Sequence, residues 1–202
     1  KGEKSQKIMW SLLLVPVLIL FMNSLTQSAI VSFLALFAIS MNFVGVGSFF
    51  SINAVGMISS RFIMNRLVRR YGEFQMILTN TIIFTLSVFL LTQVNSIFQM
   101  LLLSFPAGFA MGSVAPIINT YVIQTMPDHK KGLANAVYFS TLDIGYGIGS
   151  IAWGVIAMSM GYVQVFYFAA LLQGVAVVLT FLQIKAVGKN NQKKAVTLVN
   201  DL

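Results

Sequence analysis

One acidic residue, Asp143, stands alone in a long apolar stretch, and its isolation makes it the strongest candidate for chemistry in this sequence. Residues 132–184 contain no other charged side chain. A carboxylate at the centre of a lipid bilayer costs roughly 2.5–3.5 kcal/mol on insertion scales, so it must face protein or water. Such a group could exchange a proton, attract a cationic substrate, or only fix helix packing through hydrogen bonds.

A helix through this segment would surround Asp143 with polar and aromatic side chains. At 100° per residue, the side chains on its side of the helix are Asn135, Phe139, Tyr146 and Ser150. Gly145 and Gly149 fall on the other side and form a small-xxx-small surface, where another helix can approach closely. The spacing therefore predicts a helix with one face on a cavity and the other face packed.

Uncharged polar residues in the other apolar segments are further candidates for lining the same cavity. They are Asn23 and Gln27, which share a face at i, i+4, and Asn53, Asn119, Tyr121 and Gln124. Each could instead form a hydrogen bond between two helices, which is the commoner role of such residues in membranes.

The composition places all of these residues in a membrane protein. The 202 residues are 57% hydrophobic and only 9% charged, which excludes both a water-soluble globule and a disordered chain. There is no cysteine and one histidine, His129, so thiol catalysis, disulfides and multi-histidine metal sites are excluded. We expect no metal and no cofactor. An enzyme would need several convergent groups at one depth, and only Asp143 is available there.

The elements that must position these residues are six membrane-spanning helices. Three stretches, residues 8–60, 74–127 and 132–184, are free of charge apart from Asp143, and each is long enough for two spans of about 20 residues. The predicted spans are about 9–31, 43–64, 75–93, 98–124, 134–157 and 164–185, followed by a tail over 186–202. We therefore predict an all-α membrane protein, a six-helix transmembrane bundle.

All 13 lysines and arginines fall in the termini and in alternate connections. The positive-inside rule places these segments in the cytoplasm, and both termini with them. The predicted location is the cell membrane. No segment interleaves basic and aromatic residues on a soluble surface, so we expect no nucleic-acid partner.

Three motifs resemble those of the major facilitator superfamily of transporters. Residues 61–72, R-F-I-M-N-R-L-V-R-R-Y-G, resemble the family's cytoplasmic loop pattern R-P-x-x-G-x-L-x-D-R-x-G. Residues 126–135, M-P-D-H-K-K-G-L-A-N, resemble the family's P-x-x-x-R-G-x-A. Residues 143–149, D-I-G-Y-G-I-G, resemble the fifth span of bacterial drug and metabolite exporters in the superfamily. Their order over six spans resembles the carboxyl-terminal half of such a transporter, with two three-helix repeats.

The resemblance implies a role for three residues of the first motif, Arg61, Arg70 and Gly72, in a cytoplasmic loop that gates the conformational change. Asn65 and Arg69 depart from the pattern, which has glycine and aspartate at these positions. The resemblance also implies alternating access between this half and a separate or missing amino-terminal six-helix half.

The resemblance favours proton-coupled efflux of a small amphipathic or cationic molecule, with Asp143 as the proton carrier or the counter-charge of the substrate. Uptake or exchange of a polar metabolite on the same fold is the main alternative. A channel or a membrane scaffold is a further, less favoured alternative. The expected partners are a small-molecule substrate, protons, the lipid bilayer and the amino-terminal half.

Overall fold

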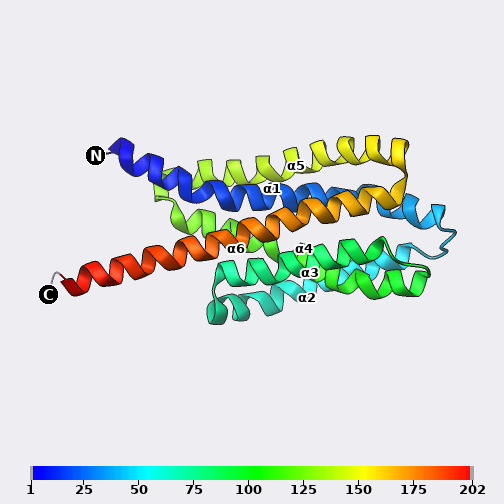
Figure 1. The fold of residues 1–202 in the computed structure, drawn as a ribbon, viewed down its shortest axis with the longest axis horizontal. Coiled ribbons are helices and arrows are strands. Elements are labelled where there is room, and N and C mark those ends of the chain that lie inside the picture. Colours follow the sequence, from blue (N-terminus) through cyan, green and yellow to red (C-terminus); the bar gives the residue numbers. More distant parts are fainter. Residues whose placement is uncertain (1, 201–202) are drawn as a thin grey trace.

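A computed structural model describes the backbone of residues 2–200 and the side chains of residues 13–186. The described chain is helical apart from short connections. Its elements are α1 (Gly2–Ser40), α2 (Gly47–Tyr71), α3 (Glu73–Leu91), α4 (Ile97–Thr125), the short 3-10 helix η1 (Asp128–Lys130), α5 (Lys131–Met160) and α6 (Tyr162–Asn200). Each α-helix runs antiparallel to the one before it, so the helices form an up-and-down bundle (Figure 1).

Both ends of the described chain lie toward one end of the bundle, together with the α2–α3 and α4–α5 connections (Figure 1). We call this the basic end, because the last turns of α2 carry four arginines and the α4–α5 connection carries Lys130 and Lys131. The other three connections lie at the opposite end, which we call the far end. The chain path therefore brings the basic segments together, as the charge distribution predicted.

The packing of the helices is symmetric between the first three and the last three. α4 packs mainly on α2 and α3, whereas α1 packs mainly on α5 and α6, and α3 packs on α6. Exchanging α1, α2 and α3 for α4, α5 and α6 leaves this pattern unchanged. The bundle therefore has the arrangement expected of two three-helix repeats.

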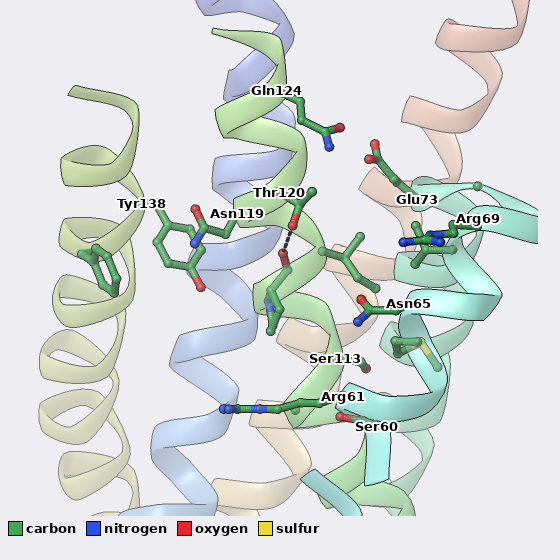
Figure 2. Close-up of a pocket in the computed structure, with 17 residues that line it drawn as sticks. Ser60, Arg61, Asn65, Arg69, Glu73, Ser113, Asn119, Thr120, Gln124 and Tyr138 are labelled. Atoms are coloured by element: carbon green, nitrogen blue, oxygen red, sulfur yellow. Dashed lines mark hydrogen bonds between the residues drawn. The ribbon is translucent and has the colours of Figure 1, made fainter. Parts of the chain in front are cut away.

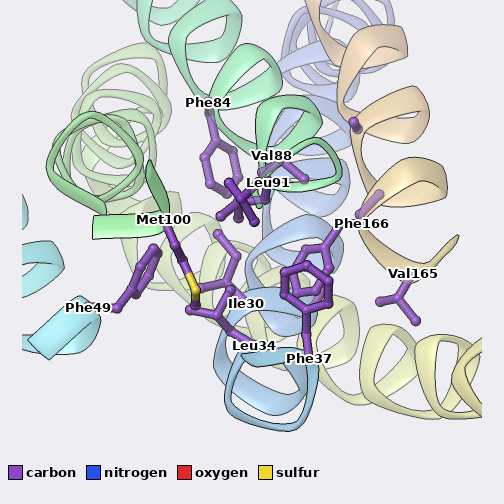
Figure 3. Close-up of a cluster of buried hydrophobic side chains, with 14 of the residues drawn as sticks. Ile30, Leu34, Phe37, Phe49, Phe84, Val88, Leu91, Met100, Val165 and Phe166 are labelled. Atoms are coloured by element: carbon purple, nitrogen blue, oxygen red, sulfur yellow. The ribbon is translucent and has the colours of Figure 1, made fainter. Parts of the chain in front are cut away.

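A large apolar cluster fills the far half of the bundle and is contributed by all six α-helices. Phe37 and Phe166 meet with ring centroids 5.2 Å apart, and Phe49, Phe84 and Met100 pack around them with no exposed surface (Figure 3). A second, smaller cluster at the basic end includes Ile77 and Ile118. The far half of the bundle is thus filled by apolar side chains.

Glycines allow two pairs of helices to approach each other closely. A Cβ atom on Gly108 of α4 would collide with the backbone of Asn53 on α2, and one on Gly56 would lie 2.5 Å from the carbonyl oxygen of Phe105. On α5, a Cβ on Gly145 would collide with Ser24 Oγ, and one on Gly149 with Ser28 Oγ, both on α1. Small residues at a helix interface permit such close packing in membranes.

Five of the helical segments are long and apolar enough to cross a membrane: Leu13–Ser40, Glu73–Leu91, Ile97–Thr125, Asp128–Met160 and Tyr162–Ala186. α2 is not among them, because serines, two asparagines and four arginines lower its hydropathy. It is nevertheless 25 residues long and packs along α4. The sequence predicted six spans, and α2 meets that prediction in length and position but not in composition.

The structure corrects the expectation that residues 61–72 form a loop. Residues 61–71 are the last three turns of α2, and the connection to α3 is Gly72 alone. Gly72 has φ 91°, a conformation that favours glycine over every other residue. Helix α1 also continues to Ser40, beyond the predicted end at 31. The expected tail begins within α6, and its side chains from residue 187 lie outside the described residues.

Candidate functional site

A cavity of about 920 Å³ lies toward the basic end, between α2, α4 and the first turns of α5 (Figure 2). Ten of the 17 residues that line it have polar or charged side chains. The uncharged polar residues are Ser60, Asn65, Ser113, Asn119, Thr120, Gln124 and Tyr138, and the charged ones are Arg61, Arg69 and Glu73.

Helical spacing aligns the lining residues of α2 and α4. On α2, Arg61, Asn65 and Arg69 recur every four residues and therefore share one face. On α4, Ser113, Thr120 and Gln124 are separated by seven and four residues, which also places them on one face. The two polar faces stand on opposite walls of the cavity.

The two arginines of the cavity are exposed and carry no ion pair with any side chain that the structure describes. In the described chain the recorded ion pair is Lys131 Nζ to Asp128 Oδ1, 2.6 Å, on the surface of the α4–α5 connection. Glu73 is half-buried at the start of α3. The cavity therefore holds two positive charges and one negative charge.

One residue of the cavity lining, Asn119, carries an unsatisfied hydrogen-bond acceptor. The Oδ1 atom of Asn119 is buried and has no hydrogen-bond partner. The neighbouring Thr120 is already satisfied, because its hydroxyl donates a 3.0 Å hydrogen bond to the carbonyl oxygen of Pro116. A buried acceptor without a partner costs about 1–3 kcal/mol, and a bound water or ligand donor would remove that cost.

A second polar group lies outside the cavity, between α1 and α5. The Tyr146 hydroxyl donates a 2.6 Å hydrogen bond to Gln27 Oε1, and Gln27 Nε2 donates to Asn23 Oδ1. Asn23 and Gln27 are buried, and Asn23 Nδ2 has no partner. These three residues, predicted as cavity residues, join two helices in the described structure.

Asp143 lies on the exposed side of α5. It is not part of the cavity lining, but Phe139, one helical turn earlier on the same face, is. The structure therefore places this carboxylate one turn beyond the cavity wall, toward the far end. Among the described side chains it has neither an ion pair nor a hydrogen bond.

The remaining predicted residues divide between the cavity and other positions. Asn119 and Phe139 line the cavity, and so do Arg61 and Gly72. Three others do not line it and have identifiable positions. Asn53 donates a 3.1 Å hydrogen bond to the carbonyl oxygen of Ser104, Tyr121 packs edge-on against Phe74, and Arg70 lies over the ring of Tyr71. Asn135 is half-buried on α5 and does not line the cavity.

Sequence reasoning found Gln124, but it missed the other polar and charged residues of the lining: Ser60, Asn65, Arg69, Glu73, Ser113, Thr120 and Tyr138. The signal was present in α2, where polar and basic residues recur every four positions from Arg61 onward. That signal has meaning only if the segment is a helix, and a loop had been expected there.

A polar cavity enclosed by antiparallel helices of membrane length is typical of membrane transport proteins. A family model described as Major Facilitator Superfamily matches residues 16–199. The chain belongs to this superfamily.

Two curated relatives are similar at low identity. An uncharacterised MFS-type transporter of Methanocaldococcus jannaschii is 22% identical over 151 residues, which cover 70% of this chain and 39% of the relative. The staphylopine export protein of Staphylococcus aureus is 21% identical over 174 residues, which cover 82% of this chain and 43% of the relative. The chain thus spans about two fifths of the length of these relatives.

Solved structures with the same fold include peptide transporters. An auto-inhibited POT family peptide transporter superposes with a TM-score of 0.74 at 13% identity, covering 87% of this chain and 37% of that chain. A mutant of the peptide transporter POT in complex with alafosfalin superposes with a TM-score of 0.73 at 14% identity, covering 86% and 38%. At such identities the likeness concerns the fold alone.

Proposed function

We propose that the protein is a secondary active transporter that exports a small amphipathic or cationic molecule by alternating access, driven by inward proton flow. The observation that carries the proposal is the polar cavity of about 920 Å³ between α2, α4 and α5, in a chain of the Major Facilitator Superfamily. In such transporters the halves rock around a site at their interface. The name of the Staphylococcus aureus relative, an export protein, supports the outward direction.

The proposed working unit contains a second six-helix half. The chain spans only 39% and 43% of the two relatives, which supports a longer transporter. α5 also exposes a row of large apolar side chains: Ile144, Ile148, Ile151 and Val155. An amino-terminal half would cover this row and close the open side of the cavity. The assembly would lie in the cell membrane with both termini in the cytoplasm.

In this proposal Asp143 is the coupling residue. Its carboxylate lies one turn from Phe139 at the cavity wall and has no ion-pairing partner among the described side chains. A carboxylate at the interface between two halves would gain and lose a proton as its access changes from one side to the other. It would thereby link substrate movement to proton movement.

The test is the Asp143→Asn variant in inverted membrane vesicles with an imposed pH gradient. We expect gradient-driven accumulation of fluorescent amphipathic dyes to fall at least tenfold. The matched control is Asp128→Asn, which removes a carboxylate from the surface connection and should transport normally. Unchanged, gradient-driven transport by Asp143→Asn would remove this residue from the mechanism.

Uptake or exchange of a polar metabolite is the second candidate function. The amide side chains of Asn65, Asn119 and Gln124 in the cavity favour it, because amides form directional hydrogen bonds with polar ligands. Transport measured in both vesicle orientations separates the two functions, since an exporter accumulates substrate only in inverted vesicles.

A further inference from the structure

We propose that the cavity binds a carboxylate of the transported molecule at its α2 wall, where Arg61 and Arg69 supply positive charge, so that the substrate is an organic anion or zwitterion and not a simple cation. This inference rests on the proposed transport function and narrows its substrate class. It keeps the amphipathic substrate of the proposed function and sets aside the cationic one, which the sequence had also led us to expect.

The first argument is the charge of the cavity. Arg61 and Arg69 both line it, and neither is paired with a described acidic side chain. Glu73, the one acidic residue of the lining, extends toward Gln124 in Figure 2 and forms no ion pair with Arg69. Two unpaired guanidinium groups attract an anion and repel a cation that has no compensating charge.

The second argument is chemical fit. A guanidinium group offers a planar fork of N–H donors that matches a carboxylate with two parallel hydrogen bonds. Asn65, on the same face of α2 between the two arginines, adds an amide donor. A volume of about 920 Å³ suits a small molecule.

The third argument is the position of the acidic group nearest the cavity along α5. Asp143 follows the cavity residue Phe139 by four residues, which is about 6 Å along a helix. A ligand with its carboxylate on the α2 wall and an amine directed along α5 toward the far end would meet this acidic group. The arrangement fits a zwitterion, with its two charges on different walls.

The test uses a cysteine in the cavity as a reporter of local charge. It is carried out on the full-length protein. This chain contains no cysteine, so Thr120→Cys introduces one in the lining, and any cysteine elsewhere in the protein would be replaced. The measured quantity is the ratio of its reaction rates with an anionic and a cationic methanethiosulfonate reagent, at low ionic strength. Each rate is divided by the rate of the same reagent with a small free thiol, because a thiolate reacts intrinsically faster with a cationic reagent. We expect the corrected ratio to favour the anionic sulfonatoethyl reagent over the trimethylammonium reagent.

Removing the cavity arginines should lower this ratio. We expect Arg61→Gln and Arg69→Gln each to reduce it about fivefold, and Arg61→Lys to keep it near the starting value. The matched control is Arg66→Gln, which removes the same charge from the same helix at a position outside the cavity lining. An equal fall in Arg66→Gln, or no fall in Arg61→Gln, would overturn the proposal.

Ligand binding is tested by protection of the same cysteine. At equal concentration, N-acetylphenylalanine and phenylalanine should slow the labelling, and phenylalanine amide, which carries only the positive charge, should not. Equal protection by the amide, or protection by none of the three, counts against the anion site. Labelling of the cysteine does not require transport, so the two proposals can be tested separately. If the labelling tests fail while dye export persists, only the anion site is contradicted. If export is absent while the labelling ratio is as expected, only the transport proposal is contradicted.

Discussion

The Tyr146 hydroxyl on α5 donates a 2.6 Å hydrogen bond to Gln27 Oε1 on α1, beside the close contact that Gly145 and Gly149 make with α1. The bond is continued on α1, where Gln27 donates to Asn23. A second polar contact joins the same two helices: Trp153 Nε1 donates a 2.8 Å hydrogen bond to the carbonyl oxygen of Leu25. α1 and α5 are thus fixed to each other by specific polar bonds as well as by close packing.

Removing the Tyr146 hydroxyl should therefore destabilise the bundle. Tyr146→Phe leaves the buried oxygen of Gln27 without its donor, and we expect a loss of about 1 kcal/mol, because interhelical hydrogen bonds in membranes average somewhat less than this and an unsatisfied buried acceptor adds to the cost. The measurement is thermal unfolding in detergent. Tyr167→Phe is the control, since this ring is 45% exposed and its hydroxyl has no recorded hydrogen bond in the described chain. Equal shifts in the two variants would contradict the prediction.

Adding a methyl group between α2 and α4 should cost more stability than removing a single polar bond. In Gly108→Ala the new methyl group would collide with the backbone of Asn53, which cannot move like a flexible side chain. We expect a loss of about 1–3 kcal/mol, the usual cost of overpacking, measured as a lower unfolding temperature.

Gly174→Ala on α6 is the matched control for that variant. A Cβ at Gly174 meets nothing within 4 Å, and alanine is the better helix former, so this change should be neutral or slightly stabilising. If both alanine variants unfold at the same temperature, the close approach of α2 and α4 is not a determinant of stability.

The fold could be predicted because the charges of this sequence are confined to a few segments. Uninterrupted apolar stretches fix the number of helices, and the basic connections fix which helix ends lie together. The ends of the helices were harder to predict. α1 continues to Ser40 and α2 to Tyr71 because a helix does not stop where hydropathy falls, and polar residues such as Arg66 are compatible with a helix that reaches water.

The candidate site was predictable only in part, because polar residues in membrane helices look alike in a sequence. Asn53 and Asn119 were equal candidates, yet Asn53 bonds the backbone of α4 while Asn119 lines the cavity. Which of the two roles an asparagine has depends on the helix that packs against it, and that information is tertiary. Arg69 was missed for a different reason, since it was assigned to a loop and its helical face was not considered.

The clustering of basic residues at one end leads to a prediction about orientation. Gln93, in the far-end connection of α3 and α4, and His129, in the basic-end connection, are both exposed. In intact cells, a membrane-impermeant maleimide should label Gln93→Cys and should label His129→Cys only after the membrane is permeabilised, because lysine- and arginine-rich connections stay in the cytoplasm. The chain supplies no cysteine that could interfere. Labelling of His129→Cys in intact cells would reverse the proposed orientation, and with it the side of the membrane from which the arginine-lined cavity receives its ligand.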